Sequence, residues 1–399
     1  MGGPSGAAAE SEPPEVHPPL RKPLRGHLRL LQFQRPLSQL QKLPLPQGNL
    51  SPRRRARRSA SNYQVVAFLY ATSGIGDPTD NVFFHPGPAV REAWDRQSNW
   101  MGYVAVTTDE VSRANGFREV YVAWRGTVTP SEWYTNIFNL SRESSKRLFS
   151  PYRREVHGGE PKVHGSWLSI YTSMNKDSIH TKQSARQQLR DVINQIRETY
   201  TNEKLSVVVT GHSLGGALVT LSAFDLAEHK VAGEDVLVSA FVFGCPQVGK
   251  EDFKKLVDDH SNLKILHIRN KKDIIPGLPD GDQSIYVPTQ TAELVVDSDK
   301  SQYSKLKSYF SLTQMKGNWH NLEATMHLVA WWNGKDNEFD SAPKADRSLA
   351  LVNKWCNYLN DDYKIPESWW IEKNKGMMFD QISGDWILDP PTTPRADRN

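Results

Sequence analysis

The chain has 399 residues, of which 38% are hydrophobic, so it can bury the core of one large domain. Its net charge of +4 is unevenly distributed, because residues 1–60 carry eleven Lys and Arg against three Asp and Glu. The remainder is mildly acidic, which gives no support for a nucleic-acid-binding face. Two cysteines, Cys245 and Cys356, are too few for a disulfide framework and favour buried thiols in a reducing compartment. No apolar run reaches the roughly 18 residues of a membrane-spanning helix.

The first 60 residues differ in composition from the rest. They hold ten of the 25 prolines and end near Arg53-Arg-Arg-Ala-Arg-Arg58, which predicts a disordered Pro/Arg-rich tail. Residues 21–58 contain no acid, as in an organelle transit peptide, and the arginines also suit a nuclear signal or an anionic lipid. A flexible tail without a specific role remains the main interpretation. We expect a folded domain at 61–390 and a disordered C-terminus at 391–399.

Two strands are predicted early in the folded domain. Residues 63–70 are apolar, and the sequence does not decide which type of secondary structure they form. Residues 102–107 indicate a strand, and residues 94–100 before them indicate a turn. A second buried strand begins at Arg118 and ends in Trp124-Arg-Gly-Thr127. In an α/β-hydrolase, a loop after such a strand supplies one N–H to the oxyanion hole. The order of the chain assigns this donor to Thr127.

The polar segment at 128–163 is longer than an ordinary loop, which favours a lid over the active site. Within it, Trp133 could lie on a mobile apolar flap or in the core of a short helix. An amphipathic helix follows at 182–200.

The most informative stretch is a β-branched run, Val207 to Thr210, followed by Gly211-His-Ser-Leu-Gly215 and an Ala/Leu-rich helix. This is the pattern of a nucleophile elbow, in which Ser213 stands on a sharp strand-to-helix turn. Larger side chains two residues before and after the serine would collide, so Gly211 and Gly215 are required there. The N–H of Leu214 is the first oxyanion donor, and His212 is expected to pack beneath the turn.

Strand and helix patterns continue to alternate after the elbow, with strands at 236–244 and 263–269 and a helix at 251–259 between them. Such alternation predicts an α/β-hydrolase fold, with a mainly parallel central sheet and helices on both faces.

The acid and the base of a serine hydrolase follow the nucleophile in the order Ser, Asp or Glu, His. Asp273 lies four residues beyond a strand, where its carboxylate would point toward Ser213; Asp280 and Asp282 are less well placed. Of the two histidines farther on, His320 stands at the start of a helix and His327 two turns inside it. A general base must reach the serine oxygen, so His320 is favoured and His327 is kept as the alternative.

These motifs resemble class 3 lipases, and among them the plant class II phospholipase A1 group, over roughly residues 62–390. The resemblance is specific at Trp124-Arg-Gly-Thr127, Gly211-His-Ser-Leu-Gly215, Phe243-Gly-Cys-Pro-Gln-Val-Gly249 and Asn318-Trp-His-Asn-Leu322, among other stretches. It implies a triad of Ser213, Asp273 and His320, an oxyanion loop at Gly126-Thr127 and a lid that includes Trp133.

The same resemblance implies hydrolysis of the sn-1 acyl ester of phospholipids, through an acyl-enzyme and without a metal or other cofactor. The substrate would be met at a membrane or micelle surface by peripheral contact, in a cytoplasmic protein. A chloroplast protein is the alternative if residues 1–60 act as a transit peptide. Galactolipid or triacylglycerol hydrolysis is an alternative activity, and a lipase-like scaffold that acts by protein contacts is the alternative of another class.

Overall fold

A computed structural model gives the structure of the chain. It describes residues 62–72, 99–126, 142–144, 148, 161–176, 178, 181–279, 286–305, 318–332, 347–370, 377–380 and 385–388. The predicted tail at 1–60, most of the predicted lid segment at 128–163 and the C-terminus at 391–399 lie outside these residues. No helix in the described part is long and apolar enough to cross a membrane.

The described chain is built on a seven-stranded sheet with the order β1-β2-β3-β6-β7-β8-β9. The pairs β1–β2 and β2–β3 are antiparallel, and every pair from β3 to β9 is parallel. The strands are β1 (Tyr63–Ala71), β2 (Asn99–Thr107), β3 (Arg118–Trp124), β6 (Leu205–His212), β7 (Val238–Phe243), β8 (Leu263–Asn270) and β9 (Ala292–Val296). In the register of β3 and β6, Trp124 stands opposite Gly211, so both strands end at one edge of the sheet.

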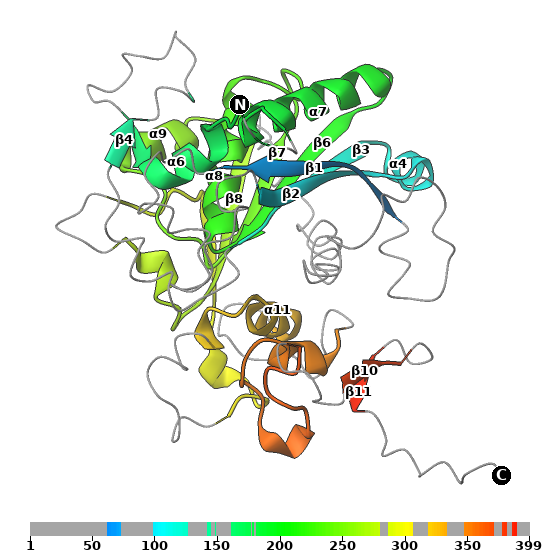
Figure 1. Cartoon of the computed structure of the whole chain (residues 1–399), viewed down its shortest axis with the longest axis vertical. Coiled ribbons are helices and arrows are strands. Elements are labelled where there is room, and N and C mark those ends of the chain that lie inside the picture. The colour runs from blue at the N-terminus through cyan, green and yellow to red at the C-terminus, as the bar shows by residue number, and fades with distance from the viewer. Residues whose placement is uncertain are drawn as a thin grey trace, which may run out of the picture. The chain divides into compact units, whose positions relative to one another are not determined.

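Helices pack against this sheet (Figure 1). α8 (Leu214–Glu228) packs against β6 and β7, and α6 (Gly165–Thr172) contacts both α8 and α7 (Ala185–Thr199). α11 (Leu322–Trp331) packs against β8 and β9. The remaining α-helices are α4 (Asp109–Asn115) and α9 (Glu251–Asp258). This mainly parallel, helix-covered sheet is the α/β-hydrolase architecture that the alternation of elements predicts.

The helix α8 is the centre of the core. All its residues from Leu214 to Ala227 are buried, as expected of a helix that is apolar on every side. Beneath it, Val207 and Val209 of β6 are fully buried, and each such side chain contributes about 1.5–3 kcal/mol to folding. The Trp124 indole donates a hydrogen bond of 2.9 Å to Ser222 Oγ, which joins β3 to α8. The helix that carries the nucleophile turn is therefore held rigidly.

A buried carboxylate ties α8 to its neighbouring helices. Asp225 is fully buried and accepts hydrogen bonds from Tyr171 of α6, at 2.9 Å, and from Arg186 of α7, at 2.7 Å. Burial alone would raise the pKa of Asp225, but the bonds from His229 and Arg186 lower it below its usual range. The carboxylate stays charged and fixes the three helices together.

The C-terminal third adds short elements around α11. They are the 3₁₀ turns η3 (Ile275–Gly277), η4 (Ser298–Lys300), η5 (Leu349–Asn353) and η6 (Asp361–Tyr363), and the hairpin β10 (Met377–Phe379) and β11 (Trp386–Leu388). A separate two-stranded ladder pairs β4 (Arg142–Ser144) with β5 (Lys162–His164). A small second core of Ala324, Val352, Cys356, Tyr358 and Leu359 joins η5 to α11.

Most predicted elements are present, with shifted ends. The apolar stretch at 63–70, whose type was open, is the edge strand β1. The helix expected at 182–200 spans Ala185–Thr199, because Ser184 caps it by accepting the Gln187 N–H at 3.2 Å. The helix α4 and the strand β9 were not predicted.

Candidate active site

The nucleophile elbow lies where β6 ends and α8 begins. Ser213 has φ 60° and ψ −126°, a strained conformation for a residue with a side chain. A Cβ added at Gly211 would lie 2.5 Å from the Gly215 carbonyl oxygen, and one at Gly215 would lie 2.6 Å from the Trp124 carbonyl oxygen. These contacts are too short for any side chain, so both glycines are needed for the turn to close.

The structure brings Ser213, His320 and Asp273 into one hydrogen-bonded line. The His320 Nε2 lies 2.8 Å from Ser213 Oγ, and its Nδ1 lies 2.7 Å from Asp273 Oδ2. The carboxylate can only accept, so Nδ1 carries the proton and Nε2 is free to take one from the serine. Ser213 and Asp273 are 5% and 8% exposed, which shields these bonds from water. Three residues far apart in sequence therefore form the arrangement of a serine hydrolase.

The acid is positioned by the turn that follows β8. Asp273 Oδ1 accepts the Ile275 N–H at 3.0 Å, and the Asp273 N–H donates to the Asn270 carbonyl at 3.0 Å. One carboxylate oxygen is thus bound to the backbone while the other is left for His320. Asn270, almost fully buried, also donates through Nδ2 to the Trp319 carbonyl at 3.4 Å, which ties this turn to the segment that carries the base.

The base, His320, is also held by His212, the residue before the nucleophile. The His212 Nε2 donates to the His320 carbonyl at 2.9 Å, and the two rings lie 4.5 Å apart between their centroids. Burial and the neighbouring imidazole hold the pKa of His212 well below its ordinary value, so His212 remains neutral. His212 therefore contacts His320 directly and helps to hold it in position. The sequence predicts only that His212 packs beneath the turn, and it does not predict this contact.

Gly244 forms the floor beneath the acid and the base. Its φ is 50°, and a Cβ there would lie 2.8 Å from Asp273 Oδ2 and 3.0 Å from His320 Cε1. The next residue, Cys245, donates its N–H to His267 Nε2 at 3.0 Å. Burial lowers the pKa of His267 to about 4, so its imidazole stays neutral and can accept this bond. The Phe243-Gly-Cys motif was the only sequence signal for this floor.

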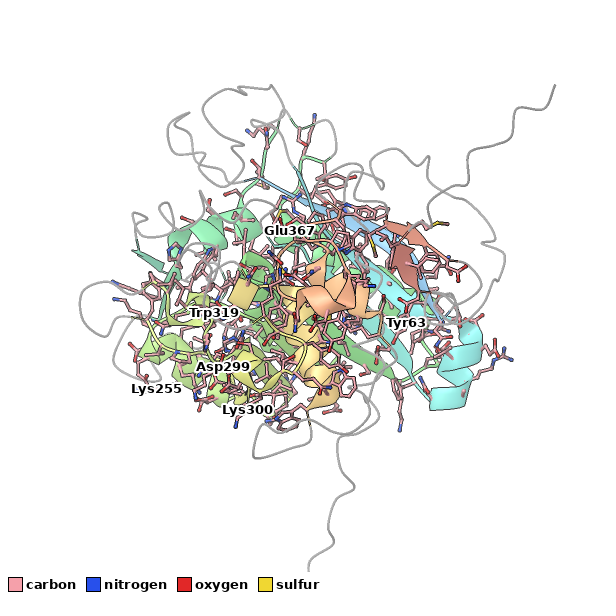
Figure 2. The ribbon with its side chains drawn as sticks, turned by 90° about the horizontal axis from the view of Figure 1, so that it is seen from below. Tyr63, Lys255, Asp299, Lys300, Trp319 and Glu367 are labelled. Atoms are coloured by element: carbon pink, nitrogen blue, oxygen red, sulfur yellow. The ribbon has the colours of Figure 1, made fainter. Side chains whose placement is uncertain are left out.

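The segment before His320 is anchored by a cation. The Lys272 ammonium lies 5.3 Å from the centre of the Trp319 ring and donates to Asp299 Oδ1 at 2.5 Å. Figure 2 labels Trp319 and Asp299, which lie near one another on the side viewed from below. The turn after β8 thus contacts the segment that carries His320, and the turn after β9 holds the lysine that makes this contact.

The alternative histidine is not part of this arrangement. His327 is buried within α11, 5.0 Å from the Tyr303 ring and 6.3 Å from the Trp331 ring between centroids. Burial lowers its pKa to about 4, so it is a neutral core histidine. Asp280 and Asp282, the alternative acids, lie outside the described residues.

The oxyanion hole is described only in part. Leu214 is the first residue of α8, and an N–H in the first turn of a helix has no partner within that helix. Thr127, the expected second donor, and Trp133, the expected lid residue, lie outside the described residues. The preceding Gly126 is described, and a Cβ added there would lie 3.6 Å from Ser213 Cβ. The chain therefore leaves β3 directly beside the nucleophile.

No group of three or more His, Cys, Asp or Glu among the described residues could hold a metal ion. The chemistry that this arrangement supports is acyl transfer: a serine hydroxyl, a histidine that can remove its proton and a carboxylate that orients the histidine.

Comparison with known proteins identifies the family of this chain. The family model of class 3 lipases matches residues 121–282, which include Ser213 and Asp273. Phospholipase A1-IIdelta of Arabidopsis thaliana is 42% identical over 83% of this chain and 80% of its own length. Phospholipase A1-II 5 of Oryza sativa subsp. japonica is 41% identical over 84% of this chain and 69% of its own.

A weaker likeness is found among solved structures. The Rhizomucor miehei lipase propeptide complex covers 60% of this chain and 58% of its own, with 18% identity and a TM-score of 0.39.

Proposed function

We infer that this chain, which belongs to the class 3 lipases and within them to the plant phospholipase A1-II group, cleaves the sn-1 acyl ester of phospholipids through Ser213, His320 and Asp273. Membership of this family makes the protein a serine ester hydrolase that acts on lipids. The observation that carries the proposal for the three residues is the unbroken line of hydrogen bonds from Ser213 Oγ through the imidazole to Asp273.

Acylation begins when Ser213 Oγ attacks the ester carbonyl carbon and His320 Nε2 takes the hydroxyl proton. Asp273 holds the Nδ1–H throughout, which orients the imidazole and stabilises its charged form. When the tetrahedral intermediate collapses, the bond between the acyl carbon and the glycerol oxygen breaks. His320 then gives its Nε2 proton to that oxygen, so the lysophospholipid leaves and the acyl group remains on Ser213.

Deacylation uses the same groups. His320 takes a proton from a water molecule as the water oxygen attacks the acyl carbon. The bond to Ser213 Oγ then breaks, the proton returns to Oγ, and the fatty acid leaves.

The negative charge of each tetrahedral intermediate needs donors. We assign one to the Leu214 N–H, at the positive end of α8, and the second to the N–H of Thr127. The contact of Gly126 with the nucleophile turn supports a donor from this loop. Removing one such donor typically costs about 10²–10³ in kcat.

The choice of phospholipids over other esters rests on the relatives, which carry the name phospholipase A1. Galactolipids and triacylglycerols remain the alternative substrates, because the head group is selected by a pocket whose lid segment lies largely outside the described residues. We propose peripheral contact with the lipid surface and a cytoplasmic enzyme. A fusion of residues 1–60 to a fluorescent protein tests the chloroplast alternative, which import of the fusion would establish.

The role of Ser213 is tested by substitution and by labelling. We expect Ser213→Ala to lose about three or more orders of magnitude in turnover of phosphatidylcholine vesicles while it still binds them. A fluorophosphonate probe should label the wild-type protein at Ser213 and leave the variant unlabelled. Hydrolysis by Ser213→Ala at the wild-type rate would refute the assignment.

A further inference from the structure

Exposed apolar side chains gather in the C-terminal part of the chain. Of the eleven large hydrophobic residues that are exposed in the described part, five lie there: Trp355, Met378, Phe379, Ile387 and Leu388. Four of these belong to the hairpin β10–β11, where Met378 stands opposite Ile387 and Met377 opposite Leu388. Leu388 is 50% exposed. So small a hairpin gains nothing from exposing these side chains to water, which indicates an interaction surface.

Tryptophan rings connect the hairpin to the rest of the domain. The Trp386 ring of β11 lies 4.7 Å from the Trp369 ring and 5.8 Å from the Trp370 ring between centroids. The Trp355 and Trp370 rings lie 6.4 Å apart, so the tryptophan rings continue from the hairpin to the residue two positions after η5. Tryptophan is favoured where one end of a side chain meets apolar groups and the other meets water, as at a lipid surface.

A buried lysine lies beside these rings. The Lys354 ammonium is 4.9 Å from the centre of the Trp370 ring and 5.5 Å from that of Trp355. Lys354 is only 6% exposed, and among the described residues no carboxylate pairs with it. The nearby Arg347 is also buried and forms an ion pair with Glu323. A buried, unpaired ammonium is costly, and an incoming anion would relieve that cost.

We propose that the hairpin β10–β11 together with Trp355, Trp370 and Trp386 docks the enzyme on a phospholipid surface, where the buried Lys354 adds a positive charge behind the tryptophan rings that attracts the lipid phosphates. This rests on the proposed function, because a phospholipid surface is where such an enzyme meets its substrate. The charge of Lys354 matches the phosphate, and the apolar hairpin matches the acyl boundary. The hairpin acids Asp380 and Asp385 stand at its turn end, so the Leu388 end faces the lipid.

The surface is connected to the active site through packed elements. β11 packs against η5, η5 packs against α11, and α11 begins two residues after His320. In Figure 1 the red hairpin and the orange turns lie on the same side as α11. Docking through the hairpin would thus hold the enzyme at the lipid surface through η5 and α11, the elements next to the catalytic base His320.

The test measures sedimentation of the full chain with phosphatidylcholine vesicles, in a Ser213→Ala background that leaves the lipid intact. We expect Leu388→Asp to lower the vesicle partition coefficient about tenfold, because a charge replaces the burial of one leucine. The matched control is Leu237→Asp, since Leu237 is 44% exposed and precedes β7 at the opposite end of the sheet. This control should bind as the parent does. The milder Leu388→Ser should lower the coefficient less, and it tests the same contact without introducing a charge.

A second variant tests the phosphate. Lys354→Met should weaken binding to phosphatidylcholine vesicles about fivefold and leave binding to vesicles of a phosphate-free galactolipid unchanged. Free inorganic phosphate at millimolar concentration should not displace the parent from vesicles if the ligand is the lipid headgroup. Displacement would instead identify a site for free phosphate and overturn the proposed docking role of Lys354.

These outcomes separate docking from catalysis. With Ser213 intact, Leu388→Asp should hydrolyse a soluble short-chain ester at the wild-type rate while its hydrolysis of vesicles falls. Equal vesicle binding by Leu388→Asp, Leu388→Ser and Leu237→Asp would overturn the docking proposal, even if phospholipid hydrolysis through Ser213 stands. Normal binding without any phospholipid hydrolysis by the wild type would overturn the function and leave docking intact.

Discussion

At the scale of single residues, the site depends on backbone that only glycine can form. Ser213 itself occupies a strained conformation, and Gly211, Gly215 and Gly244 each stand where a Cβ would meet other atoms at 2.8 Å or less. Strain of this kind persists only where the surrounding structure enforces it, here the packing of β6 and α8. The glycine spacing around the serine was readable in the sequence because the elbow is a local turn.

Gly244 provides a direct test of this floor. We expect Gly244→Ala to reduce turnover of a soluble ester at least about a hundredfold, because its Cβ would displace Asp273 Oδ2 and the His320 ring. The measurement is kcat with a short-chain ester, alongside thermal unfolding.

The matched control is Gly116→Ala. Gly116 also has positive φ, at 76°, but a Cβ there would meet nothing within 4 Å. It should lose about 1 kcal/mol of stability and keep its turnover. Equal turnover in the two variants would contradict the account of Gly244 as a steric floor.

At the scale of elements, three loops converge on one histidine. The turn after β8 supplies Asp273, the elbow after β6 supplies Ser213 and the contact from His212, and the start of α11 carries His320. The order of serine, acid and histidine along the chain narrowed the choice, and the position of Asp273 after a strand and of His320 at a helix start favoured these two residues over the alternatives. The supporting contacts of Asn270, His212 and His267 were not predictable, because each depends on how distant turns pack and leaves no local pattern.

The start of α11 sets the position of His320. Asn321 caps this helix by accepting the Ala324 N–H at 3.0 Å. Asn321→Ala should lower the free energy of unfolding by about 1 kcal/mol and lower kcat more than it changes KM, because the residue before it carries the base.

The control for this prediction is Ser184→Ala at the start of α7. Ser184 caps its helix in the same manner, and it does not contact the three site residues. It should lose similar stability with no change in kcat. A kcat that falls equally in both variants would show that the effect is general destabilisation.

At the scale of the whole molecule, the sheet was predictable and its C-terminal surroundings were not. Buried β-branched runs identified the parallel strands, since such runs are hydrophobic on both faces. The edge strand β1, the strand β9 and the hairpin β10–β11 are partly exposed, so their sequence patterns are weak. β9 packs against α11 and β11 packs against η5, and such tertiary contacts leave no local pattern. The buried cations near η5 likewise come together only through tertiary contacts.

Those cations make stability depend on pH. Burial, with a smaller effect from Arg347, lowers the pKa of Lys354 from 10.5 to about 8. Between these values the unfolded chain binds more protons than the folded one, so the free energy of unfolding rises with pH. We expect a gain of up to about 3 kcal/mol between pH 8 and pH 10.5 relative to Lys354→Met, measured by urea denaturation. Parallel pH curves for the two proteins would show that Lys354 ionises normally.

The central claim, that this fold hydrolyses the sn-1 ester of phospholipids at Ser213, is tested most directly by one measurement. A phosphatidylcholine with different acyl chains at sn-1 and sn-2 is incubated with the protein, and the released acids are identified by mass spectrometry. We expect release of the sn-1 acid with a 2-acyl lysophospholipid, and no release by Ser213→Ala. Predominant release of the sn-2 acid, or equal release by the variant, would contradict it.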